Sequence, residues 1–175
     1  MIWNKISSFF LCLSNEKFNT EMQQVVLIIG GNEGNREILI QMAKKKLDGH
    51  FGPAAKASSV YESSPWGGNS SGNYLNQVLI YNVFKSPMGI LHAIQQIEIE
   101  LGRERKEKWG NRTMDIDILY YGNLVVELPD LVIPHPYLHL RSFVLEPLVE
   151  IMPDYYHPIL KKTNLELLKD LNTKH

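Results

Sequence analysis

Two aspartates, Asp115 and Asp117, could do chemistry because a single residue separates them within a run of β-forming side chains. Side chains alternate between the two faces of a strand, so both carboxylates are expected on one face, roughly 7 Å apart. Neighbouring carboxylates repel each other unless a cation lies between them, and Mg²⁺ is commonly held by one or two carboxylates plus substrate phosphates. The pair therefore indicates a magnesium site, although spacing alone is more often that of two aspartates exposed on a solvated sheet face.

The ten residues before this strand, 103–112, favour the magnesium interpretation because they concentrate positive charge. They carry a local net charge of +3 in a chain whose net charge is -1. Cations beside paired carboxylates fit a polyphosphate that is bound through metal and guanidinium groups together. A solvated charged loop is the alternative, but Trp109 and Gly110 are unusual in such a loop. The cations are Arg103, Arg105, Lys106, Lys108 and Arg112.

Two further features carry less information. Residues 30–34 read GGNEG between an expected strand and an expected helix, but they match neither of the common nucleotide-binding glycine patterns. We interpret them as a turn. His135 lies between two prolines, where it could bind phosphate or could be an ordinary loop histidine.

Composition limits the class of protein. The 175 residues favour one domain that is large enough to fold without a metal or disulfide. The balanced charge argues against a nucleic-acid or membrane partner, and no apolar run reaches the length of a membrane span. Cys12 is the single cysteine, so no intrachain disulfide can form, and we expect a reducing, cytoplasmic location.

Hydrophobic periodicity and turn residues predict the elements that must position these side chains. We expect strands at residues 25–30, 57–61, 74–84 and 113–121 and helices at 35–47, 86–101, 143–151 and 164–171. Gly122-Asn123 predicts a two-residue hairpin whose return strand is 124–127. The order β-α-β-β-α-β, followed by a C-terminal elaboration, predicts an α+β domain with helices on the faces of an antiparallel or mixed sheet.

The first 24 residues have a different character. Their apolar stretch is short and no cleavage site for a secretory signal follows it. We therefore expect residues 1–24 to be an extension that precedes a single domain of residues 25–175. A weak signal or anchor, or a helix of the fold, are the alternatives.

With these residues assembled, residues 25–158 resemble the 6-hydroxymethyl-7,8-dihydropterin pyrophosphokinases of folate biosynthesis. The central motif is Arg103-x-Arg105, then Trp109-Gly110-x-Arg112-Thr113-x-Asp115-x-Asp117-Ile118. Matching positions upstream are Tyr61, Pro65, Tyr74-Leu75-Asn76, Gln95 and Glu98, and downstream Pro134-His135, Arg141, Phe143-Val144-Leu145 and Pro147-Leu148. So many positions in register make the resemblance specific.

The resemblance implies a ferredoxin-like fold and a reaction that moves pyrophosphate from ATP to the hydroxymethyl group of the pterin, releasing AMP. It implies two Mg²⁺ ions, held by Asp115 and Asp117, and charge stabilisation by Arg103 and Arg112. It assigns to the ATP site Gln95, Glu98, Arg105, Trp109, Ile118, His135 and Arg141. It assigns to the pterin site Ser63, Ser64, Trp66, Tyr74, Asn76 and Phe143.

Three positions depart from the family pattern. Gly31 stands where serine is common, and we expect this difference to matter little. Lys108 replaces an arginine, which loses bidentate geometry, and Pro136 replaces a tyrosine found in some members.

Two other functions remain alternatives. An RNA-binding module is one, although the paired aromatics typical of such sheets are missing and the aspartates would repel RNA. An unrelated magnesium-dependent nucleotidyltransferase is the other. We expect a monomer that binds ATP and the pterin.

Overall fold

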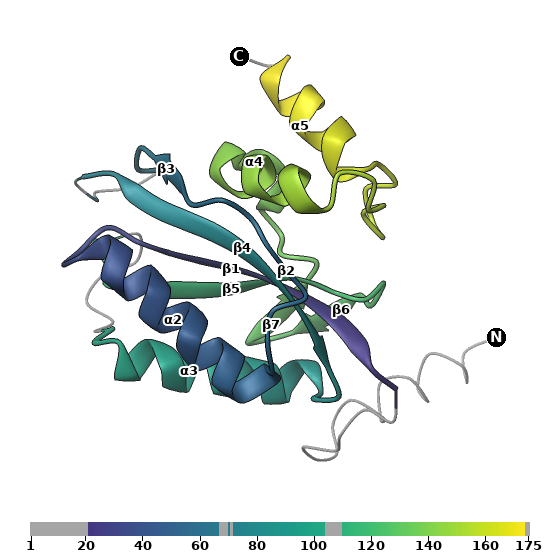
Figure 1. Cartoon of the computed structure of the whole chain (residues 1–175). Coiled ribbons are helices and arrows are strands. Elements are labelled where there is room, and N and C mark those ends of the chain that lie inside the picture. The colour runs from purple at the N-terminus through teal and green to yellow at the C-terminus, as the bar shows by residue number, and fades with distance from the viewer. Residues whose placement is uncertain (1–20, 67–69, 71, 104–109, 174–175) are drawn as a thin grey trace.

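The sheet is built around one strand that is buried on both faces. The computed structural model describes residues 21–66, 70, 72–103 and 110–173. Strand β1 (Gln23–Gly31) lies between β4 (Tyr74–Val83) and β5 (Asp115–Tyr121) and pairs antiparallel with both. Short strands β2 (Lys56–Ala57) and β3 (Tyr61–Ser63) pair with the other edge of β4 (Figure 1). The strand order β2-β4-β1-β5 confirms the expected antiparallel α+β domain. Strand β1 begins at Gln23, two residues before the strand start expected at residue 25.

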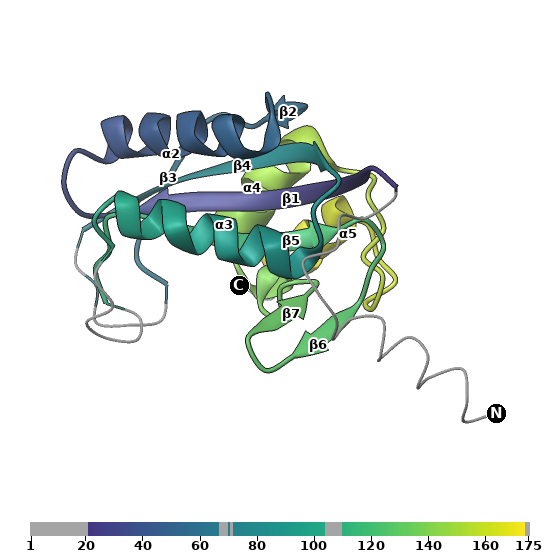
Figure 2. The ribbon, with the colours of Figure 1, turned by 90° about the horizontal axis from the view of Figure 1, so that it is seen from below.

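Helices cover both faces of the sheet, which explains the uninterrupted apolar run of β1. Helices α2 (Arg36–Phe51) and α3 (Pro87–Glu100) lie on one face, and α4 (Ser142–Ile151) lies on the other with α5 (Asn164–Asn172) beside it (Figures 1 and 2). Leu27 and Ile29 join the core beneath α2 and α3. Val26 and Ile28 join the core beneath α4.

Side chains at the helix ends agree with the predicted boundaries, except at the end of α2. The Asn35 and Ser86 side chains accept hydrogen bonds from the first turns of α2 and α3, as N-cap residues do. Gly102 ends α3 with a φ of 80°, which other residues rarely adopt. Helix α2 runs to Phe51, beyond the expected residue 47, because Phe51 packs its ring 5.7 Å from that of Tyr81 in the core.

The expected strand at 57–61 is wrong, because the structure divides it into β2 and β3. Ser58 lies at the break. Its hydroxyl accepts the hydrogen bond of the Val78 N–H at 2.9 Å, in the place of a backbone carbonyl. A serine side chain that takes a strand's hydrogen bond interrupts the regular ladder.

The hairpin expected at Gly122-Asn123 is also wrong. Gly122 donates its N–H to Gln24 of β1, and its carbonyl accepts from the Tyr155 hydroxyl, so the chain turns away from β5. The return strand instead becomes β6 (Val126–Leu128), which pairs with β7 (Leu131–Ile133) in a separate two-stranded sheet.

A β-bulge divides β5 into two halves. The register with β1 shifts between Val26 and Leu27, where Leu119 is the extra residue. As a result Leu119 and Tyr120 both pack in the α4-side core, and the simple alternation holds only from Asp115 to Leu119. In the described ranges, none of the helices combines the length and the apolar character needed to cross a membrane.

Candidate active site

A pocket of about 570 Å³ opens where β1 ends and β5 begins. That volume lies within the range of small-molecule sites. Most of the site residues predicted from the sequence line it: Ser63, Ser64, Trp66, Tyr74, Asn76, Arg103, Arg112, Asp115, Asp117, His135, Arg141 and Phe143. The structure therefore brings together residues from β3, β4, β5, the charged segment and the start of α4.

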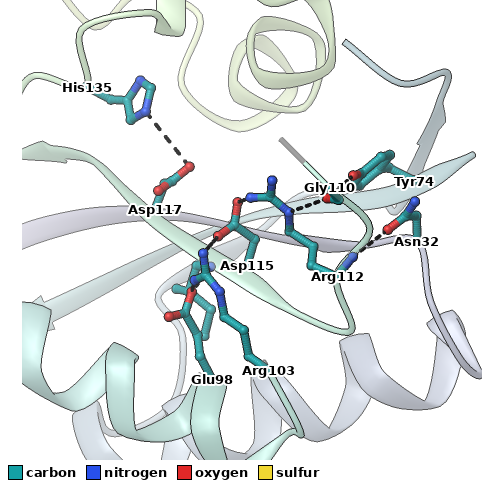
Figure 3. Close-up of polar contacts among 10 residues, drawn as sticks. Asn32, Tyr74, Glu98, Arg103, Gly110, Arg112, Asp115, Asp117 and His135 are labelled. Atoms are coloured by element: carbon teal, nitrogen blue, oxygen red, sulfur yellow. Dashed lines mark hydrogen bonds and ion pairs between the residues drawn. The ribbon is translucent and has the colours of Figure 1, made fainter. Parts of the chain in front are cut away.

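Asp115 forms the centre of the charged part of the pocket. One of its oxygens lies 2.9 Å from Nη2 of Arg103, and the other accepts from Nη1 of Arg112 (Figure 3). The two arginines come from opposite ends of the charged segment that precedes β5. A single carboxylate therefore holds two guanidinium groups at the pocket wall, where charge-assisted hydrogen bonds are strong.

Asp117 shares the strand face with Asp115, as alternation predicts. Desolvation and the nearby charge of Asp115 raise the pKa of Asp117 above its ordinary value. His135 Nε2 lies 3.8 Å from the carboxylate. Burial, with the charge of Arg141, lowers the pKa of His135 to about 4. The imidazole is therefore neutral near pH 7 and does not neutralise Asp117.

Glu98 lies behind this wall rather than in it. It is 3% exposed, and it pairs with Arg103 from the side opposite to Asp115. The structure does not place Glu98, Gln95 or Ile118 among the lining residues of the pocket, although the sequence assigned all three to the ATP site. Ile118 is instead buried in the core beneath α2 and α3, on the other strand face from Asp117. Arg105 and Trp109 lie outside the described residues.

Three aromatic rings lie around the guanidinium group of Arg141, a buried residue that lines the pocket. The guanidinium carbon lies 4.5 Å from the ring centroid of Trp66, 5.5 Å from that of Tyr137 and 5.7 Å from that of Phe143. These distances are those of cation–π contacts. Tyr137 was not predicted from the sequence, where only the neighbouring position Pro136 was considered.

The uncharged part of the pocket is centred on Asn76. This side chain is 4% exposed and donates a hydrogen bond to the Ser63 hydroxyl at 2.9 Å. Gly30 of β1 lies against it, and a Cβ there would stand 2.4 Å from Asn76 Oδ1. Only glycine therefore leaves the amide in its present place. The Tyr74 hydroxyl donates to the Gly110 carbonyl at 3.4 Å, which connects this part to the charged segment.

Gly31 is needed for a second close approach. A Cβ at this position would lie 2.2 Å from the carbonyl oxygen of Thr113, far inside normal contact distance. We expect the difference from serine to matter little for function, but in this arrangement a serine would have to displace the backbone before β5. Asn32, the next residue, contacts the same segment. It matches the asparagine of the Gly-Ser-Asn that is common at this position in the family, but it was assigned no role in the site from the sequence.

The donors around the pocket suit magnesium that arrives with a phosphate ligand. Asp115 and Asp117 present carboxylate oxygens from one strand face, as hard cations prefer. Among the residues that the structure describes, no cluster of three or more His, Cys, Asp or Glu side chains could hold an ion alone. Magnesium usually completes its coordination with water and substrate phosphates, so this donor set fits an ion that is bound jointly with a substrate.

Comparison with known proteins identifies the family. The sequence model of the 7,8-dihydro-6-hydroxymethylpterin-pyrophosphokinase (HPPK) family matches residues 26–153. The chain belongs to this family. HPPK membership confirms the resemblance seen in the sequence and the enzymatic function that it implied, pyrophosphoryl transfer to hydroxymethyldihydropterin in folate biosynthesis.

Individual relatives agree with the HPPK assignment. The chain is 42% identical over 152 residues to a 2-amino-4-hydroxy-6-hydroxymethyldihydropteridine pyrophosphokinase of Aquifex aeolicus, covering 87% of this chain and 94% of the relative. A Bacillus subtilis protein of the same name is 39% identical over 126 residues, or 71% of this chain and 75% of that protein. In fold, the chain matches Plasmodium falciparum HPPK-DHPS with a TM-score of 0.73 at 17% identity. That match covers 92% of this chain and only 44% of the longer one.

Proposed function

We propose that the pocket binds ATP and 6-hydroxymethyl-7,8-dihydropterin side by side and transfers the β,γ-pyrophosphate of ATP to the pterin, releasing AMP. The observation that carries this proposal is the bridge from Arg103 through Asp115 to Arg112, next to Asp117 (Figure 3). Two guanidinium groups and two carboxylates at one wall can receive a polyphosphate and its cations. An amide and aromatic rings at the other wall can receive a flat heterocycle.

The phosphate half consists of the charged groups. Asp115 and Asp117 would hold two Mg²⁺ ions that enter with ATP, and those ions would neutralise the phosphate charge. The raised pKa of Asp117 supports this role, because a bound cation would offset the repulsion from Asp115. His135 and Arg141 would complete the ATP site on this side of the pocket. Arg105, Trp109, Gln95 and Ile118 remain proposed ATP residues on the family resemblance alone.

The pterin half consists of neutral groups. Tyr74 and Phe143 would stack on the two faces of the ring, and Asn76 would hydrogen-bond its edge. The buried Asn76 amide, fixed by Ser63, supports recognition of a ring with both donors and acceptors, since an unmatched ligand would leave buried polar groups unpaired. Ser64 and Trp66 would close this part of the pocket.

Transfer forms a bond between the hydroxymethyl oxygen and the β-phosphorus of ATP. The bond between that phosphorus and the oxygen leading to the α-phosphorus breaks, its electron pair leaves with AMP, and the hydroxyl proton passes to solvent. Catalysis of this kind depends on positioning and charge stabilisation. Arg103 and Arg112 would exchange Asp115 for the oxygens of the transferring group. Asp115 therefore holds both guanidinium groups in place before the substrate arrives.

Architecture and assembly complete the proposal. The order β2-β4-β1-β5, with α2 and α3 on one face, supports the ferredoxin-like assignment. We also propose that residues 25–175 form one domain and that it acts as a monomer.

Product identity tests the proposed reaction. The protein is incubated with Mg²⁺, ATP and 6-hydroxymethyl-7,8-dihydropterin, and the nucleotides are separated by chromatography. AMP should form in step with a pterin diphosphate. ADP as the pterin-dependent product would refute the proposal, pyrophosphate release would indicate a nucleotidyltransferase, and no turnover would indicate a binding module.

A further inference from the structure

Asn32, directly after β1, holds both backbone polar groups of Arg112, which lies 80 residues away in the sequence. Its side-chain Oδ1 accepts the Arg112 N–H at 2.9 Å (Figure 3). Its own backbone N–H donates to the Arg112 carbonyl at 3.0 Å, and the N–H of Glu33 reaches the same carbonyl at 3.2 Å. The amide nitrogen of Asn32 also donates to Asn111 Oδ1 at 2.9 Å.

These contacts fix the backbone from which the Arg112 side chain extends. The close approach of Gly31 to Thr113 holds the next residue of the same segment. From this anchored backbone the Arg112 guanidinium reaches Asp115 and, through Nε, the Gly110 carbonyl at 3.4 Å. Asn32 itself does not line the pocket. Its contacts therefore reach the site through Arg112 and Asn111.

We propose that Asn32 is a positioning residue that directs the Arg112 guanidinium toward the transferring phosphates. This inference rests on the proposed role of Arg112 in the reaction. Rearranging the backbone at Arg112 moves the guanidinium group at the end of a long side chain, and a misplacement of about 1 Å at a reacting centre can cost 10²-fold in rate. Asn32→Ala removes the acceptor of the Arg112 N–H and the bond to Asn111, so it should lower kcat by about 10- to 100-fold.

The experiment is a double-mutant cycle on kcat, measured as AMP release, with the full chain. It compares wild type, Asn32→Ala, Arg112→Ala and the double variant. If Asn32 acts through Arg112, Asn32→Ala should have almost no further effect once Arg112 is alanine, since coupled residues are non-additive. Asn82→Ala, an exposed asparagine at the far end of β4, is the matched control and should match wild type.

Asn32→Asp separates positioning from general destabilisation. An aspartate keeps an acceptor for the Arg112 N–H, so this variant should retain more kcat than Asn32→Ala, and KM for the pterin should stay unchanged in both. If the kcat losses of Asn32→Ala and Arg112→Ala multiply in the double variant, the inference is overturned while the proposed function stays intact. Wild-type kcat in Arg112→Ala would overturn both the role of Arg112 and the inference. If Asn32→Ala does not fold, the same cycle with Asn32→Leu, which is close to asparagine in size and also lacks the acceptor, decides with the same two outcomes.

Discussion

Glu98 of α3 accepts a hydrogen bond from the backbone N–H of Ile116 at 2.8 Å, which ties the helix to β5 between the two aspartates. The same carboxylate pairs with Arg103, which in turn pairs with Asp115. The buried glutamate thus supports a chain of charges that ends at the pocket wall. Its position explains why the family pattern includes an acidic residue that does not line the pocket.

The two aspartates should differ in their effect on stability although both are needed for activity. Asp115→Asn and Asp117→Asn should each lower kcat by about 10²-fold or more, because each variant removes a carboxylate that would hold the magnesium ions against the phosphates. Asp115→Asn should also lower the free energy of unfolding by about 1–3 kcal/mol, since it weakens the bonds to Arg103 and Arg112. Asp117→Asn should melt at the wild-type temperature or above it, because the substitution removes a repelled charge.

Steady-state kinetics with and without saturating Mg²⁺, together with circular-dichroism melts, check this pair of variants. Near-native turnover in either variant would contradict the proposed metal site. Equal melting temperatures for the two variants would contradict the prediction that Asp115, through its ion pairs with Arg103 and Arg112, contributes more to stability than Asp117.

Glu98 should make stability depend on pH. Burial raises its pKa to about 7, against the opposing effect of Arg103, whereas a glutamate in an unfolded chain titrates near about 4.3. Between these values the folded protein keeps a proton that the unfolded chain has released, so this group's contribution to stability falls as pH rises from about 4.3 to about 7. Glu98→Gln cannot titrate. Urea unfolding from pH 4.5 to 8 should show the variant gaining stability relative to wild type as pH rises.

The matched control for this measurement is Glu127→Gln, which removes an exposed glutamate on β6. A difference between wild type and Glu98→Gln that stays constant across the pH range would show that Glu98 does not titrate there.

Trp66 should affect ATP binding even when no pterin is present, because its ring lies over Arg141. A cation–π contact is worth about 0.5–2 kcal/mol, so Trp66→Ala should weaken the affinity for a non-hydrolysable ATP analogue by about 2- to 30-fold. Trp66→Phe keeps a ring and should lose less. Isothermal titration without pterin makes the test, and unchanged affinity in Trp66→Ala would restrict Trp66 to the pterin site.

Residues 1–21 should be dispensable. Strand β1 begins at Gln23, and Met22 before it is 58% exposed. A protein that starts at Met22 should melt within about 2 °C of the full chain, an interval worth less than about 1 kcal/mol in a domain of this size, and should turn over at the same rate. Differential scanning calorimetry measures the first quantity. A large drop in melting temperature would show that the removed segment packs on the domain.

Patterns of neighbouring residues were sufficient to predict much of the fold and the shared strand face of Asp115 and Asp117. The apolar run of β1 and the spacing of Asp115 and Asp117 depend on alternation along a single strand, which holds up to the bulge at Leu119. The break at Ser58 could not be predicted in this way. Its hydroxyl replaces a backbone acceptor only because β4 lies beside it, and local sequence does not show which strands are neighbours.

The missed site residues share a similar cause. The contact of Asn32 with Arg112 joins two segments that the sequence separates by 80 residues. Tyr137 lines the pocket and its ring lies 5.5 Å from the Arg141 guanidinium carbon, a contact between loop residues that no strand or helix periodicity predicts. Ile118 was assigned by family position, whereas strand alternation alone already placed it on the face away from Asp117.

The direction of β1 determines where this enzyme can be joined to another protein. Gln23 and Gly30 stand at opposite ends of the strand, roughly 23 Å apart at the usual rise per residue, and only Gly30 lines the pocket. At the other terminus, α5 packs on α4 (Figure 1). A second catalytic unit attached before β1 would leave the entrance for both substrates open.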